Sequence, residues 1–139
     1  MFDHIGIVVS NLSKSRELYT RVLEPLGFRL LEDHSQQEGE GWLVYGAGAA
    51  APFFVVAAGR PSFWSNEHRT GRSPIHCAFA AKSQESVNKF HELGLVSGAT
   101  DNGAPGDRGR GYYAAYLLDL DGNNIEAGCR HTSHESLGA

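Results

Sequence analysis

Residues 3–28 read DHIGIVVSNLSKSRELYTRVLEPLGF, and residues 74–99 read PIHCAFAAKSQESVNKFHELGLVSGA. In each stretch a histidine, His4 or His76, heads an apolar run that is followed by a polar patch, a helix-like segment and a glycine. Short runs rich in β-branched residues are typical of strands, and apolar residues three and four apart are typical of helices. The sequence therefore begins the same supersecondary unit twice.

The first unit is predicted to be βαβββ. Its helix is capped by Asn11 or Ser13 and ends at Pro25 and Gly27, since capping side chains start helices and Pro and Gly stop them. The residues between the second and third strands, 34–41, are polar and contain glycine, which indicates a loop. The four predicted strands are 4–9, 28–32, 42–45 and 53–57.

The second unit repeats this order. Ser83 is the predicted cap of its helix and Gly94 the predicted end. Because residues 100–111 (TDNGAPGDRGRG) are rich in turn formers, they are predicted to be a loop. The predicted strands are 75–81, 95–99, 112–119 and 124–130.

These patterns predict one α+β domain over residues 1–130, built of two βαβββ modules. Module 1 covers about 3–58 and module 2 about 75–130. A linker, 59–74, joins them, and a polar C-terminal tail covers 131–139. A spacing of about 70 residues is too long for a solenoid repeat and suits a duplicated module.

Composition excludes several classes of protein. With 139 residues, a net charge of −4 and no basic block, the chain has no sign of a nucleic-acid or membrane-surface partner. No apolar run is long enough to span a bilayer, and the N-terminus lacks the pattern of a secretion signal, so we expect a cytoplasmic protein. Cys77 and Cys129 lie in apolar runs, which favours reduced, buried thiols over a disulfide.

Alternation along the strands places three chemically distinctive side chains on comparable faces. His4 shares a face with Gly6 and Val8, and His76 shares one with Ala78 and Ala80. Glu126 is a carboxylate inside an otherwise apolar strand, which is costly unless it is paired or bound to a cation. Two imidazoles and a carboxylate facing one cavity suit a divalent metal ion. Singly, each histidine is also compatible with an ordinary surface or core role, and the glutamate with an ion pair.

The stretch at 3–28, the segment PIHCAFAA and the motif LDLDGNNIE (118–126) resemble the vicinal oxygen chelate superfamily of glyoxalase I, bleomycin-resistance proteins and extradiol dioxygenases. The resemblance covers about 3–130. It implies two βαβββ modules forming an open, curved β-barrel around one metal site, and a homodimer. Carried over, His4, His76 and Glu126 are the implied metal ligands, with Glu126 also catalytic.

One ligand of the glyoxalase set has no counterpart. Family glyoxalases place a glutamate in the fourth strand, where this chain has Phe54 as the nearest equivalent. A 2-His-1-carboxylate set leaves metal positions open. We therefore expect a glyoxalase- or dioxygenase-like enzyme with one divalent metal ion (Zn, Fe, Mn, Ni or Co) acting as a Lewis acid on a small, oxygen-bearing, metal-chelating substrate. The alternative is a non-catalytic protein that binds and sequesters a small molecule, as bleomycin-resistance proteins do.

Aromatic residues and the glycine-rich stretch at 101–111 suggest a substrate pocket. Apolar, aromatic walls suit small ligands, and Arg108 or Arg110 could meet an anionic group. The alternatives are ordinary core packing and a solvated loop. The predicted aromatic lining is Phe53 or Phe54, Trp64 and Tyr113, with Tyr116 as a further candidate.

Overall fold

The structure is a computed structural model and describes residues 1–59, 70–71 and 75–130. The predicted tail, most of the predicted linker and Trp64 lie outside these residues. Module 1 contains β1 (His4–Val9), α1 (Leu12–Leu23), η1 (Glu24–Leu26), β2 (Arg29–Ser35), η2 (Gln37–Gly39), β3 (Gly41–Gly46) and β4 (Phe53–Ala58). Module 2 contains β5 (His76–Ala80), α2 (Gln84–Val96), β6 (Thr100–Asp107), β7 (Tyr112–Leu118) and β8 (Asn124–Arg130).

Each module forms its own four-stranded mixed sheet. The strand orders are β1-β4-β3-β2 and β5-β8-β7-β6, and in each sheet the first strand runs parallel to its neighbour while the other pairs are antiparallel. The predicted α+β fold of two βαβββ modules is confirmed. Within one chain the sheets do not close into a barrel, and among the described strands β1 and β5 remain open edges.

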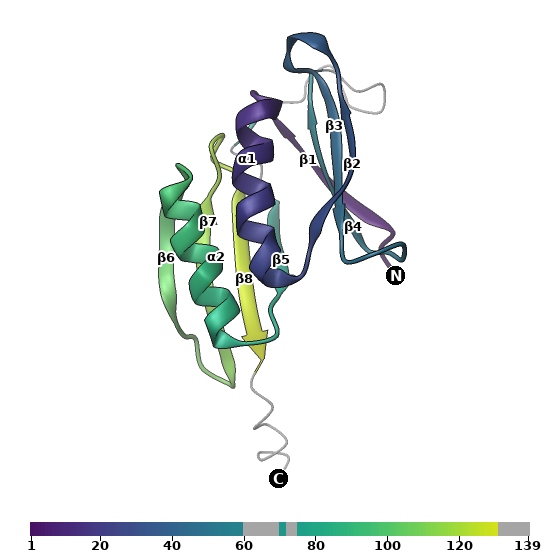
Figure 1. Cartoon of the computed structure of the whole chain (residues 1–139). Coiled ribbons are helices and arrows are strands. Elements are labelled where there is room, and N and C mark those ends of the chain that lie inside the picture. Colours follow the sequence, from purple (N-terminus) through teal and green to yellow (C-terminus); the bar gives the residue numbers. More distant parts are fainter. Residues whose placement is uncertain (60–69, 72–74, 131–139) are drawn as a thin grey trace.

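The two helices bring the modules together. α1 and α2 lie side by side, and each packs on its own sheet (Figure 1). Asn11 and Ser83 cap them, since their side chains accept hydrogen bonds from the backbone N–H groups of Lys14 and Ser86. The helix-facing sides of both sheets share one apolar core, in which the rings of Phe54 and Phe79 meet edge to face at 5.0 Å. The opposite side of each sheet, here called its outer face, therefore points away from this core.

The predicted end of the second helix is wrong. Gly94 lies inside α2, which continues to Val96, and residues 95–99 form the end of the helix and a turn rather than a strand. A Cβ on Gly94 would lie 2.3 Å from Cδ1 of Leu117 on β7. The glycine is thus required by close packing of helix on sheet, and it does not end the helix.

The prediction of a loop at 100–111 is also wrong, because β6 occupies most of it. Among the described strands β6 pairs only with β7, and its register shifts twice around Gly103. An edge position with bulges thus accommodates its Gly and Pro residues. Gly103 has φ +156°, and a Cβ there would lie 2.3 Å from the ring of Tyr116. The buried His91 of α2 holds the strand, with Nε2 2.8 Å from Oδ1 of Asp101.

Hydrogen bonds at the LDLDGNNIE motif join the modules. The buried carboxylate of Asp119, in the β7–β8 turn, accepts a 2.6 Å hydrogen bond from the hydroxyl of Tyr19 on α1. It also accepts from the side chain and backbone N–H of Asn123 and from the backbone N–H of Asp121. The Asn123 side chain in turn donates to the carbonyl of Val8 on β1. The most distinctive motif of the sequence therefore fixes one module against the other.

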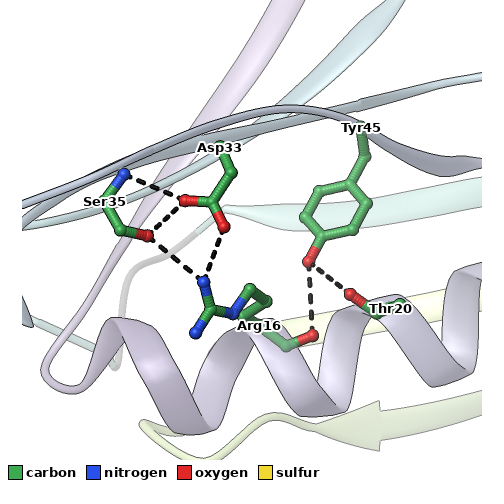
Figure 2. A network of polar contacts seen from close by, with 5 residues as sticks. All are labelled: Arg16, Thr20, Asp33, Ser35 and Tyr45. Carbon is green, nitrogen blue, oxygen red and sulfur yellow. Dashed lines mark hydrogen bonds and ion pairs between the residues drawn. The ribbon is translucent and has the colours of Figure 1, made fainter.

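A second network attaches α1 to its own sheet (Figure 2). Arg16 donates a 2.6 Å hydrogen bond to Asp33, whose carboxylate also accepts from the backbone N–H of Ser35 at 2.9 Å. Tyr45 and Thr20 pair their hydroxyls at 3.0 Å. Hydrogen bonds from Ser35, and then Arg16, hold the pKa of Asp33 below its usual value. These contacts carry β2 to Ser35, beyond the predicted loop start at residue 34.

Candidate functional site

The outer face of the β5–β8 sheet carries a buried carboxylate at its centre. Glu126 is only 5% exposed, and its Oε1 lies 2.5 Å from Nε2 of His76 on the neighbouring strand β5. The other ring nitrogen of His76, Nδ1, lies 2.7 Å from Oδ1 of Asn124, its partner in the β5–β8 register. The strand pairing thus places the imidazole between two side chains of β8 and fixes both of its nitrogens.

The second oxygen of Glu126 is held from the other side of β8. Oε2 accepts a hydrogen bond from the hydroxyl of Tyr112 on β7. The guanidinium of Arg130 lies 4.2 Å from the centre of the Tyr112 ring. Burial and the hydrogen bond to Glu126 raise the pKa of the Tyr112 phenol, so at neutral pH it is a protonated donor.

A second aromatic ring borders His76. The ring centre of Tyr116, on β7, lies 6.2 Å from that of His76. The guanidinium of Arg108 lies 4.8 Å from the Tyr116 ring centre, and its Nη2 donates to the backbone carbonyls of Ala104 and Ala114. The predicted site residue Arg108 therefore contacts Tyr116, the ring that borders His76, and its two backbone hydrogen bonds brace β6 against β7.

His4 lies at the corresponding place of module 1. It begins β1 on the outer face of the other sheet, opposite Phe53 in the β1–β4 register. Its side chain is 59% exposed, and Nδ1 lies 2.8 Å from the carboxylate of Asp3. Since the outer faces of the two sheets point away from the shared core, His4 does not join the His76–Glu126 pair within one chain.

This arrangement of two βαβββ modules matches a known family. The sequence-family model of the glyoxalase/bleomycin resistance protein/dioxygenase superfamily matches residues 1–127. The chain belongs to this superfamily. Of the curated proteins, none matches the chain. Among the described residues, no helix is long and apolar enough to cross a membrane.

Solved structures of similar fold align along nearly the whole chain. A glyoxalase/bleomycin resistance protein from Albidiferax ferrireducens is 30% identical, with a TM-score of 0.74 over 94% of this chain and 98% of that one. A family enzyme from Burkholderia phytofirmans is 17% identical, with a TM-score of 0.67 over 92% and 97%. TnmS3, an antibiotic-binding protein from Streptomyces, is 20% identical, with a TM-score of 0.64 over 94% and 95%. The last two show the shared fold alone.

Members of the superfamily often bind a divalent metal ion, and one chain fits such an ion only in part. An imidazole beside a deeply buried carboxylate is the right kind of donor pair for first-row metal ions. Among residues 1–59, 70–71 and 75–130, however, no three His, Cys, Asp or Glu side chains lie close enough to hold a metal ion. A nitrogen bound to metal carries no hydrogen, so metal on Nε2 of His76 would replace its hydrogen bond to Glu126. One chain supplies two donors, and a third has to come from elsewhere.

Two other predicted pocket residues, Phe54 and Tyr113, do not share this face. Phe54 is buried on the helix side of β4, between the rings of Tyr19 and Phe79. Tyr113 also faces the helices, and its hydroxyl donates to Asn88 of α2 at 2.6 Å. Both side chains therefore pack in the core, because strand alternation points them to the face of the sheet opposite the site. Trp64 lies outside the described residues.

Tyr112 and Arg130 lie beside the site and were not predicted, whereas Tyr116 was a candidate for its aromatic lining; all three follow from the same strand parity. Tyr112 and Tyr116 lie opposite Arg130 and Glu126 in the β7–β8 register, so all four share the outer face. Alternation from Glu126 identifies Arg130, and the strand pairing then identifies the two tyrosines. The sequence signal was present, but the pairing partner of each β7 residue depends on the turn geometry.

Proposed function

We propose that this protein is a divalent-metal-dependent enzyme of the glyoxalase/dioxygenase type, whose metal site forms between two copies of the chain. His76 and Glu126 of one copy and His4 of the other are the ligands. The single observation that carries the proposal is the buried Glu126 carboxylate at 2.5 Å from His76, with an exposed histidine at the equivalent start of the other module.

The open edges of the two sheets support a homodimer. The outer edges β2 and β6 carry charged residues, bulges, glycine and proline, which discourage pairing with another chain. In contrast, β1 and β5 are apolar edge strands with exposed large residues beside them, Phe2, Ile5 and Ile75. A two-fold dimer that brings β1 of one copy alongside β5 of the other covers these edges and brings His4 to the His76–Glu126 pair.

The chemistry follows from the donor set and the neighbouring side chains. Bound metal would act as a Lewis acid on adjacent oxygens of a small, chelating substrate. Glu126 would hold the metal and remain within reach of a substrate proton. Tyr116 offers a ring for a substrate to lie against, and the Arg108 guanidinium beside it favours a substrate with negative charge.

A specific observation supports a second candidate, a metal-free protein that binds a small molecule. Both oxygens of Glu126 already accept hydrogen bonds, from His76 and Tyr112. Its charge is therefore partly satisfied without a metal ion. The similarity in fold to the antibiotic-binding TnmS3 is compatible with this second function.

Metal binding by untagged protein separates the two candidates. We expect Zn, Mn, Fe, Co or Ni to raise the melting temperature by roughly 10 °C at about a hundredfold excess over Kd. His4→Ala and Glu126→Ala should each abolish the rise. The exposed His34, on the outer face of β2, supplies the matched control, and His34→Ala should leave the rise intact.

Mixed dimers test whether the site is shared between copies. A dimer of one His4→Ala chain and one Glu126→Ala chain holds one complete ligand set and one doubly broken set. It should bind one metal ion, whereas each variant alone binds none. No metal in the mixed dimer would show that the ligands come from a single chain. Wild-type protein that binds no metal would leave the metal-free binding function.

A further inference from the structure

The side chain of Tyr112 reaches Glu126 by lying along the backbone of β8. Tyr112 is opposite Arg130 in the register, four residues from Glu126, and Gly128 lies between them on the same face. A Cβ on Gly128 would lie 1.8 Å from the Tyr112 hydroxyl oxygen and 2.2 Å from the carbon that bears it. Any side chain at 128 would therefore push the phenol away from the carboxylate.

The ring of Tyr112 is also held against one of its faces. The Arg130 guanidinium lies over it at 4.2 Å, an attractive arrangement of a cation and an aromatic face. The three groups thus form a continuous chain along β8, in which Arg130 holds the ring, Gly128 leaves room for it and the hydroxyl holds Oε2 of Glu126.

We infer that Tyr112 is the positioning residue for Glu126, and that Gly128 is the residue that permits it. This inference rests on the proposed function. A glutamate side chain has several rotatable bonds, and a partner on one oxygen restricts the direction of the other. If His76 held a metal ion in place of its hydrogen bond to Oε1, Tyr112 would still occupy Oε2, and Oε1 would be the oxygen of Glu126 free to hold the metal. Side chains that hydrogen-bond to a metal ligand strongly affect the affinity of the site for the metal ion.

The neighbouring tyrosine supplies a matched control. Tyr113 also has a hydroxyl in a 2.6 Å hydrogen bond to an oxygen, but it faces Asn88 on the helix side of the sheet. Tyr112→Phe and Tyr113→Phe therefore each remove one hydroxyl from adjacent residues of β7, and only the first removes a contact of Glu126. Gly128→Ala displaces the Tyr112 phenol while retaining the hydroxyl.

The experiment measures the Kd of Co²⁺ and Zn²⁺ by calorimetry, together with the absorption spectrum of bound Co²⁺. We expect Tyr112→Phe and Gly128→Ala to weaken binding by about 10–100-fold, the usual effect of losing an outer partner of a ligand. Both should alter the Co²⁺ spectrum. Tyr113→Phe should match wild type in both readouts. Circular dichroism of the metal-free proteins confirms folding, and Tyr112→Phe carries the test if Gly128→Ala does not fold.

The outcomes separate the two proposals. If wild type binds metal and Tyr112→Phe binds it equally well with an unchanged Co²⁺ spectrum, the role of Tyr112 is overturned and the proposed function stands. If wild type binds no metal, both proposals fail. Loss of affinity in Tyr112→Phe together with an equal loss in Tyr113→Phe would also overturn the inference, because it would reflect a general weakening of β7.

Discussion

Removing the hydroxyl of Tyr19 tests how strongly the two modules are held together. Tyr19 is fully buried, and its hydroxyl donates at 2.6 Å to the carboxylate of Asp119 in the other module. A hydrogen bond to a charged group contributes about 1.5–3 kcal/mol net. Asp119 keeps its other donors, from Asp121 and Asn123. We therefore expect Tyr19→Phe to lower the free energy of unfolding by about 2 kcal/mol.

Tyr45→Phe is the matched control. Tyr45 is also fully buried, but both partners of its hydroxyl are neutral, Thr20 at 3.0 Å and the backbone carbonyl of Arg16 at 3.3 Å (Figure 2), so losing this hydroxyl costs about 1 kcal/mol. Urea denaturation at pH 7, followed by circular dichroism, measures both losses. In melting temperature the expected drops are roughly 7 °C for Tyr19→Phe and roughly half of that for Tyr45→Phe. Equal losses in the two variants would refute the conclusion that a charged bond joins the modules.

The loss in the free energy of unfolding caused by Tyr19→Phe should also depend on pH. Burial, and then the charge of Asp119, raise the pKa of Tyr19 well above its ordinary value. The folded state therefore keeps its proton above pH 10, where the unfolded chain releases it. Stability from this group is fully present below about pH 10 and falls as the pH rises beyond it. The gap between wild type and Tyr19→Phe should thus narrow between pH 9 and 11, and a gap that widens would contradict this cause.

Two further predictions concern packing and acid stability. Gly94→Ala should destabilise the protein by about 1 kcal/mol, because overpacking against Leu117 costs more than the gain in helix propensity. Gly48 has open space around it, so Gly48→Ala should stay within about 0.5 kcal/mol of wild type. Chemical denaturation measures the free energy of unfolding of both variants. Asp33→Asn should lower the melting temperature slightly at pH 7 and not at all in strong acid. Hydrogen bonds from Ser35 lower the pKa of Asp33 in the folded state. The Asp33 carboxylate therefore stabilises the fold above about pH 4, and this stabilisation is lost as the pH falls through the folded-state pKa. A gap in melting temperature that does not shrink between pH 7 and strong acid would contradict this.

Much of the fold could be predicted from local patterns. The strands at His4 and His76 and both helix caps are visible because alternation, β-branched residues and capping side chains act over a few residues. The errors arose where a distant side chain decides the local structure. Gly94 resembles a helix end until Leu117 is placed against it, and Gly103 resembles a loop residue until Tyr116 covers it.

The sequence predicted the kinds of side chain in the candidate site better than it predicted which residues lie together. Glu126 and His76 could be paired because a carboxylate inside an apolar strand needs a partner, and the structure places them 2.5 Å apart. The predicted union of these two with His4 remains a prediction, since strand alternation describes faces within one sheet and not how two sheets face each other. Phe54 was predicted to line the pocket but faces the core. It lies one residue further along β4 than Phe53, and a step of one residue moves a side chain to the other face of the sheet.

The contact between Tyr19 and Asp119 shows how much the two modules differ although their elements have the same order. Tyr19 follows the helix cap Asn11 by eight residues, and His91 follows the cap Ser83 by the same interval (19 − 11; 91 − 83). Both side chains are buried and polar, yet Tyr19 reaches into the other module while His91 binds Asp101 within its own. The turn of module 1 that corresponds to the Asp119 turn, residues 47–52, reads AGAAAP and has no acceptor side chain. A chain made of two first modules would bury a tyrosine hydroxyl without its carboxylate, so the two modules are complementary and neither can replace the other.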